Sequence, residues 1–195
     1  MGAMHVLTLD LAPVTPKDAP LLHRVFHLSP SYFALIGMEL PTLEDVVRDL
    51  QTLEVDPRRR AFLLFLGQEP VGYLDAKLGY PEAEDATLSL LLIREDHQGR
   101  GLGRQALERF AAGLDGVRRL YAVVYGHNPK AKAFFQAQGF RYVKDGGPTL
   151  TWYVRPLCHH PLRACASIGV PAKGGGFFGA TRAREGTPRP GPSGR

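Results

Sequence analysis

Hydrophobic and polar positions follow two different periods along residues 1–156. Apolar residues at every second position, or in short unbroken runs, predict strands. Seven segments show this pattern: HVLTLDLA (5–12), RRRAFLLFLG (58–67), PVGYLDAKLGY (70–80), DATLSLLLI (85–93), RRLYAVVYG (118–126), FRYV (140–143) and LTWYVRPL (150–157). The second and third segments meet at Gly67-Gln68-Glu69-Pro70, a break the size of a turn, so these two are expected to form a hairpin.

Apolar spacing of three and four residues predicts four helices, at about 16–27, 43–50, 104–114 and 129–138. Thr15 and Thr42 each precede a helix and are each followed three residues later by an aspartate, the pattern of a capping box. Asn128 is a further capping residue, with proline after it in the first turn. The predicted order is βααβββαβαββ, an α+β fold. The segment from 85 to 126 predicts one parallel step within a mixed, mostly antiparallel central sheet flanked by helices.

Composition divides the chain into two parts. Of the 195 residues, 44% are hydrophobic, which suits a globular domain over 1–156. The net charge of +5 comes entirely from residues 157–195, a basic tail rich in glycine and proline that we expect to be flexible or loosely docked. The absence of a long apolar run and of a cysteine framework favours a cytoplasmic protein with no membrane partner. Cys158, His159, His160 and Cys165 match no common zinc spacing, so no metal is predicted.

One loop carries candidate chemistry, namely HQGRGLGR (97–104), between the strand 85–93 and the next helix. Glycine lets a ligand approach the backbone, and the first amides of a helix have no intrahelical acceptor. Together with two arginines, they predict a phosphate site. A tight turn that needs glycine is the simpler alternative. A Walker loop is excluded because Gly103 is followed by Arg104 and Gln105, and a Rossmann loop would normally follow the first strand.

Two motifs resemble those of the GNAT acetyltransferases. Gln98-x-x-Gly101-x-Gly103 is similar to the family's Q/R-x-x-G-x-G/A loop. The segment from Asn128 to Phe140 resembles its later N-x-x-A-x-x-x-Y-x-x-x-G-F helix. The resemblance covers residues 4 to about 155 and implies the acyl-CoA N-acyltransferase fold, with acetyl-CoA as co-substrate.

The resemblance also implies which residues bind acetyl-CoA. The pantetheine arm would pair with the backbone of the strand 85–93 where it splays away from the strand 118–126. The pyrophosphate would lie on the glycine loop. Phe134 would pack near the arm. The implied cofactor-binding residues are Leu91, Leu92, Ile93, Gln98, Gly99, Arg100, Gly101, Leu102, Gly103, Arg104, Asn128 and Phe135.

The catalytic residues are less defined, because Phe135 stands where the family often has a tyrosine that protonates the leaving thiolate. Tyr125 is the predicted substitute acid, although an aromatic residue in a sheet is commonly structural. Glu84 is the predicted base, with Asp85 and Ser89 as further candidates.

The predicted function is direct transfer of an acetyl group to an amine of a small molecule or peptide. The apolar segment 29–41 suits an acceptor with an apolar part or a homodimer contact, and Glu39, Glu44, Glu82 and Glu84 could attract a cationic amine. One alternative is a CoA-binding or regulatory module with degenerate catalysis, as Phe135 would favour. The other is a nucleic-acid-binding protein acting through its tail; the neutral balance of residues 1–155 argues against that partner.

Overall fold

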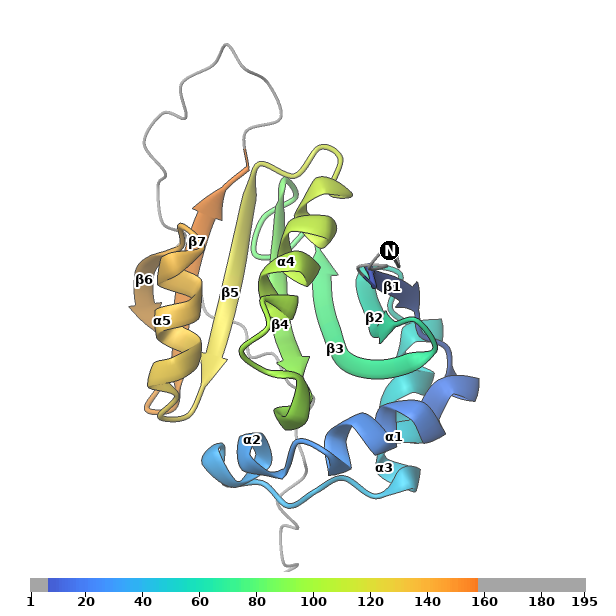
Figure 1. The fold of residues 1–195 in the computed structure, drawn as a ribbon. Helices are drawn as coiled ribbons and strands as arrows, with labels where there is room; N and C mark the ends of the chain where they lie inside the picture. The colour runs from blue at the N-terminus through green and yellow to red at the C-terminus, as the bar shows by residue number, and fades with distance from the viewer. Residues whose placement is uncertain (1–6, 158–195) are drawn as a thin grey trace, which may run out of the picture.

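The computed structural model describes residues 7–157, so the predicted tail lies outside the described residues except for Leu157. The elements in chain order are β1 (Leu9–Pro13), η1 (Pro16–Asp18), α1 (Ala19–His27), α2 (Pro30–Leu35), α3 (Leu43–Gln51), η2 (Thr52–Glu54), β2 (Arg59–Leu66), β3 (Glu69–Leu78), β4 (Asp85–Ile93), η3 (Glu95–His97), α4 (Leu102–Ala112), β5 (Arg119–Tyr125), α5 (Pro129–Ala137), β6 (Arg141–Asp145) and β7 (Leu150–Pro156). The seven strands form one sheet in the order β1-β2-β3-β4-β5-β7-β6 (Figure 1).

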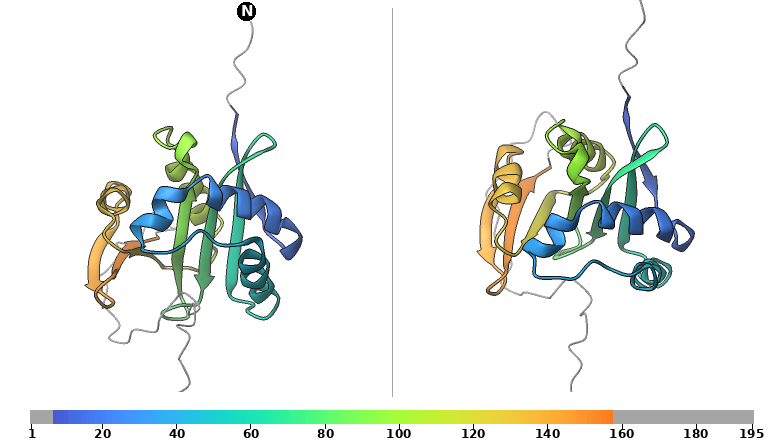
Figure 2. Two further views of the ribbon diagram at one scale, coloured as in Figure 1. Left: turned by 90° about the horizontal axis from the view of Figure 1, so that it is seen from below. Right: turned by 60° about the horizontal axis from the view of Figure 1, so that its bottom comes forward.

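Helices lie on both faces of the sheet. α4 and α5 cover one face, where Leu107, Leu120 and Phe140 belong to the larger hydrophobic core (Figure 1). α1 and α3 pack on the other face around Leu22, Leu50 and Tyr73, while α2 continues across the end of the sheet beside β4 and β5 (Figure 2). The predicted fold class, a mixed and mostly antiparallel sheet between helices, is confirmed.

Segments with strong local signals in the sequence form the elements that those signals predict. β2 and β3 make the expected hairpin around Gly67, whose φ of +59° lies in the left-handed region. Thr42 caps α3: its Oγ1 accepts the N–H of Asp45 at 3.1 Å, while the Asp45 carboxylate accepts the N–H of Thr42 at 3.0 Å. β1 begins at Leu9, later than the alternating pattern suggested.

The helix α2 is an addition to the predicted order. The predicted helix 16–27 stops before Ser29 and Pro30, yet Pro30 is the first residue of a new helix, where its missing N–H costs nothing. Ser29 is buried, and its Oγ donates to the carbonyl of Val25 at 2.9 Å. The chain therefore turns at Ser29 and continues as a six-residue helix.

β4 and β5 form the parallel step and then separate. Their register runs from Asp85 opposite Arg119 to Leu88 opposite Ala122 and goes no further. Ser89 is the extra residue of a bulge in β4, because Asp75 of β3 pairs with Leu90 and the next residue of β3 pairs with Leu88. Beyond this bulge the two strands leave a gap in the middle of the sheet.

Candidate active site

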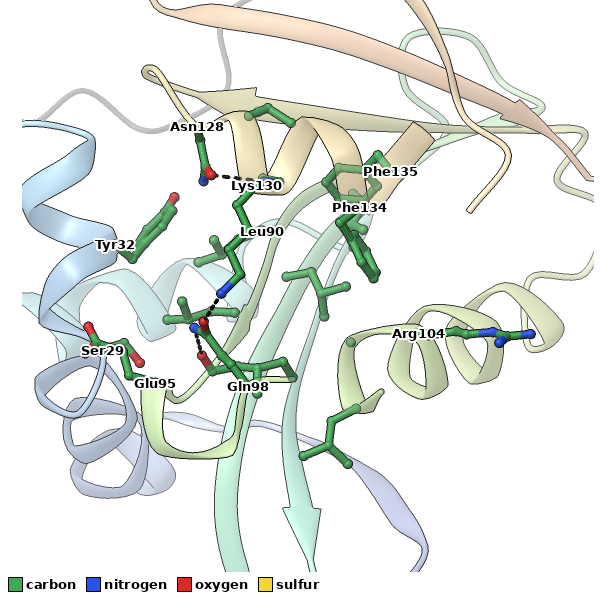
Figure 3. A pocket seen from close by; sticks show the side chains of 18 of the residues that line it. Ser29, Tyr32, Leu90, Glu95, Gln98, Arg104, Asn128, Lys130, Phe134 and Phe135 are labelled. Carbon is green, nitrogen blue, oxygen red and sulfur yellow. Dashed lines mark hydrogen bonds between the residues drawn. The ribbon is translucent and has the colours of Figure 1, made fainter. Parts of the chain in front are cut away.

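A cavity of about 770 Å³ occupies the gap between β4 and β5. Its walls come from the last residues of both strands, the loop before α4, the first turn of α4, one side of α5, and α2 (Figure 3). The predicted cofactor residues line it with one exception; those that do are Leu91, Leu92, Ile93, Gln98, Gly99, Gly101, Leu102, Gly103, Arg104, Asn128 and Phe135. The structure thus brings together in one cavity residues that are up to 44 positions apart in the sequence.

Backbone groups of β4 face the cavity. The N–H of Arg94 donates to the carbonyl of Val71 in β3 at 2.8 Å. Since successive residues of a strand direct their polar groups to opposite edges, those of Leu91 and Ile93 point away from β3 and toward the gap. β5 does not pair with them, so this edge of β4 is open to an extended ligand.

The glycine loop presents a row of amides to the same cavity. Gly99 and Gly101 both have φ of +75°, which turns the chain sharply before α4. Hydrogen bonds between described residues engage none of the backbone N–H groups of residues 99–104, and the first helical bond runs from Gln105 to the carbonyl of Gly101. These donors and the positive end of α4 form an anion site.

The two arginines of the loop differ in position. Arg104 lines the cavity from the first turn of α4. Arg100 is the exception among the predicted cofactor residues: it is exposed and does not line the cavity, and its Nη2 donates weakly to the carbonyl of Asp96 at 3.4 Å. Arg104 is also exposed, and its guanidinium points away from the other labelled residues, so of the two arginines it is the one that lines the cavity, but at its rim (Figure 3).

Gln98 joins three parts of the site. Its Nε2 donates to the carbonyl of Ile93 at 2.9 Å, which fixes the loop to the end of β4. Its Oε1 accepts from Nζ of Lys130 at 2.7 Å, so a lysine of α5 reaches across the cavity to the loop (Figure 3). No sequence pattern singles out Lys130, because a lysine in the first turn of a helix carries no signal of its own.

α5 contributes one polar and two aromatic residues. Oδ1 of Asn128 accepts the N–H of Ala131 at 3.0 Å, so this side chain caps the helix as well as lining the cavity. Phe134 approaches Gly103: a Cβ on that glycine would lie 3.4 Å from its ring. Phe135 is buried between Phe134 and Phe140, with ring centroids 5.2 Å from each.

Two tyrosine hydroxyls lie near the gap from the side of α2. Tyr125, at the end of β5, and Tyr32, in the middle of α2, both line the cavity, and the Tyr32 hydroxyl is turned toward Asn128 (Figure 3). Burial raises the pKa of Tyr32 to about 12. Burial, with the nearby Tyr32 and Asp75, raises the pKa of Tyr125 well above its ordinary value. Both phenols are therefore protonated at neutral pH.

The predicted carboxylate base requires a correction. Glu84 is exposed just before β4, at the opposite end of that strand from the glycine loop, and forms an ion pair with Arg118 at 3.3 Å. Asp85 is fully buried, where its carboxylate accepts two hydrogen bonds from Arg119 at 2.7 and 3.1 Å. Neither lines the cavity, so neither is retained as a base; Ser89 does line it.

The acidic residues expected to attract an amine are also elsewhere. Glu39, Glu44 and Glu82 do not line the cavity. Glu95, in η3, does, and it is the one carboxylate of the lining within residues 7–157. No local pattern singles out Glu95, because its position depends on the contact with Ser31 of α2.

Residues 7–157 show neither a metal-binding cluster nor a membrane-spanning helix. No group of three or more histidine, cysteine, aspartate or glutamate side chains in this range could hold a metal ion. Cys158, His159, His160 and Cys165 lie outside the described residues. None of the helices described here has the length and apolar character needed to cross a membrane.

Comparison with solved structures shows the same fold in acetyltransferases. A ribosomal L7/L12 alpha-N-protein acetyltransferase, RimL, in complex with coenzyme A is 19% identical, with a TM-score of 0.63 over 77% of this chain and 94% of that one. A spermidine N-acetyltransferase from Vibrio cholerae, in complex with CoA and spermine, is 16% identical, with a TM-score of 0.65 over 77% and 96%. The aminoglycoside acetyltransferase AAC(6')-Ib with coenzyme A is 18% identical, with a TM-score of 0.63 over 76% and 95%.

Sequence comparison identifies the family. No curated protein matches the chain. The family model described as "Acetyltransferase (GNAT) family" matches residues 22–140, which is more than half of the sequence and includes both α2 and the glycine loop. The split sheet, the open amides before α4 and this match agree, and the chain belongs to the GNAT family of acetyltransferases.

Proposed function

We propose that the protein transfers the acetyl group of acetyl-CoA directly to an amine of a small molecule or peptide, with no covalent enzyme intermediate. One observation carries the proposal: the cavity between β4 and β5 combines an open strand edge with an unpaired row of loop amides. A strand edge suits the amide-containing pantetheine arm, and the loop amides suit a pyrophosphate. The three solved relatives named above are all complexes with coenzyme A.

Different residues of the site bind different parts of CoA. The amides of residues 99–104 and the guanidinium of Arg104 bind the pyrophosphate. Leu91 and Ile93 pair with the pantetheine arm, and a backbone N–H of this edge faces the thioester carbonyl. That N–H stabilises the negative charge that develops on the carbonyl oxygen as the amine attacks. Gln98 holds the loop against β4 and Asn128 contacts the arm from α5.

Tyr125 supplies the proton in this mechanism. The neutral amine attacks the thioester carbon, the C–S bond breaks, and the thiolate needs a proton. Phe135, at the position of the family's usual tyrosine, has none to give, whereas Tyr125 lines the cavity and carries a phenol that is protonated at neutral pH. The amine loses its own proton to solvent.

Two measurements test this function. Calorimetric titration with acetyl-CoA is expected to show one site, and release of free thiol in the presence of amines is expected to show turnover. Tyr125→Phe is expected to lower kcat by about a hundredfold with the affinity for acetyl-CoA unchanged, since general acid catalysis contributes on the order of 10² to 10⁴. Binding of acetyl-CoA without thiol release for any amine would instead support the alternative of a CoA-binding module, which Phe135 favours.

A further inference from the structure

The α2 side of the cavity holds one fixed negative charge. Glu95 follows β4 directly, and its Oε1 accepts the N–H of Ser31 in the first turn of α2. Its own N–H donates to the carbonyl of Leu28 at 3.3 Å. These two bonds fix the carboxylate beside Ser29 and Tyr32 (Figure 3). Its second oxygen, Oε2, takes part in none of the hydrogen bonds found between described residues, so it is available to a ligand.

Charge is unevenly distributed in the cavity. Arg104 comes from α4 and Lys130 from α5, where the Lys130 ammonium is bonded to Gln98, while Glu95 is bonded to Ser31 at the start of α2. Within the described part of the lining, Glu95 is the single carboxylate. One carboxylate balances one ammonium group. A second or third ammonium on the same ligand would meet no further anion here and would be repelled by the two cations.

Beyond Ser29 and Ser31, the α2 side of the cavity carries apolar surface. Tyr32 and Leu35 line the cavity from successive turns of α2, and Leu35 is 41% exposed, so apolar surface continues from the cavity to solvent. Met38, whose N–H donates to the carbonyl of Phe33 at 2.9 Å, is 40% exposed beyond the end of the helix. Contact between this wall and an apolar group of the ligand would stabilise binding, because it removes apolar surface from water.

We propose that the acceptor is a primary amine with a single positive charge next to an apolar group, and that Glu95 binds its ammonium on the α2 wall. This inference rests on the proposed function and adds the class of acceptor to it. Polyamines and aminoglycosides, which carry several positive charges and little apolar surface, are disfavoured. Glu95 is a recognition residue; the ammonium gives up its proton to solvent before the nitrogen attacks.

The test measures binding of amines to the protein saturated with CoA, so that it does not depend on turnover. Calorimetry is carried out with 2-phenylethylamine, with ethanolamine, which lacks the apolar group, and with spermidine. We expect 2-phenylethylamine to bind at least about tenfold more tightly than either, because a charged hydrogen bond and an apolar contact act together only in that ligand. Tighter binding of spermidine or equal binding of ethanolamine would overturn the proposal.

The variant Glu95→Gln keeps the size of the side chain and an oxygen that can accept the N–H of Ser31, and removes the charge. It is expected to weaken the binding of 2-phenylethylamine about tenfold and to leave the affinity for CoA unchanged. Glu82→Gln, on an exposed residue outside the cavity, is the matched control. Unchanged amine affinity in Glu95→Gln would contradict the role of Glu95. If the amine binds as expected but no thiol is released from acetyl-CoA, the acceptor site stands and the proposed catalysis fails.

Discussion

Gly126, at the end of β5, lies directly against Leu35, at the end of α2. A Cβ added to Gly126 would come within 3.1 Å of the Leu35 carbonyl oxygen. At the other end of α2, the carboxylate of Glu95 binds the N–H of Ser31. α2 is thus attached beyond β4 at its first turn and beyond β5 at its last, and it bridges the gap between the two strands.

This contact predicts the effect of replacing Gly126 by alanine. Its φ is +66°, so any side chain is strained by roughly 1–2 kcal/mol, and the close oxygen adds about 1 kcal/mol or more of steric cost. Urea unfolding is expected to show a free energy of unfolding that is lower by the sum of these two costs. Gly37→Ala is the matched control, because Gly37 has φ of +70° with nothing within 4 Å of the added carbon. Equal losses for the two variants would show that α2 does not depend on this contact.

The anion site predicts the effect of a negative charge in the glycine loop. Gly101→Asp places a carboxylate among the free amides and is expected to reduce the affinity for CoA by more than about tenfold, measured by calorimetry. Gly116→Asp is the control, since Gly116 has φ of +71° and, like Gly101, open space around the added carbon, but lies outside the cavity. Unchanged affinity in Gly101→Asp would contradict the assignment of the pyrophosphate.

The position of Lys130 predicts that this residue contributes to CoA binding through a phosphate group. Its ammonium is held by the neutral amide of Gln98 and is free to exchange that partner for a phosphate, which binds it more strongly. Lys130→Met is expected to lower the affinity for CoA three- to tenfold, on the order of the contribution of one surface charge. The affinity of the variant should also depend less steeply on salt concentration. Pantetheine, which has no phosphate, should bind the variant as it binds the parent protein. Lys132→Met, on the same helix but outside the cavity, should change neither affinity.

The position of Phe135 predicts a gain of activity. Phe135→Tyr adds a hydroxyl to a ring that lines the cavity and is expected to raise kcat for thiol release by providing a second proton donor. The variant should also rescue part of the loss in Tyr125→Phe. Phe140→Tyr, on a buried neighbour that does not line the cavity, is the control and is expected to lose stability without a gain in rate. No change in kcat would show that a hydroxyl at this position does not protonate the leaving thiolate.

Tyr32 predicts how stability changes in alkali. Burial raises its pKa from 10.0 to about 12, so between these values the folded protein keeps a proton that the unfolded chain has lost. The free energy of unfolding therefore falls as pH rises from about 10 to 12. Tyr32→Phe should make this fall smaller, as measured by urea unfolding at a series of pH values. Tyr142→Phe, on a residue that is 56% exposed, is the control, and an equal fall in Tyr32→Phe would contradict the shift.

Local signals in the sequence predicted most of the fold. The capping pairs, the short hairpin turn and the strand–loop–helix order depend on neighbouring residues, and the structure has them where they were expected. α2 was missed because six residues are too few to establish a helical period, and Ser29 and Pro30 fit both an end and a beginning.

The candidate site was less predictable because it depends on distant contacts. The loop glycines and Asn128 could be selected by their motifs, and they line the cavity. Glu84 was chosen for lying near the start of β4, yet the cavity opens at the other end of that strand. Glu95 and Lys130 gain their roles only when α2 and α5 fold against the loop, which no local pattern reveals.

The short register between β4 and β5 has a mechanical consequence. Four residue pairs join a four-stranded half of the sheet to a three-stranded half, and the core beneath α4 and α5 spans both. An extended molecule inserted beyond Leu88 would lengthen the connection between the two halves of the sheet. Amide hydrogens along the open part of β4 should accordingly exchange with deuterium most slowly when the gap is filled, so that occupancy itself determines the stiffness of the sheet.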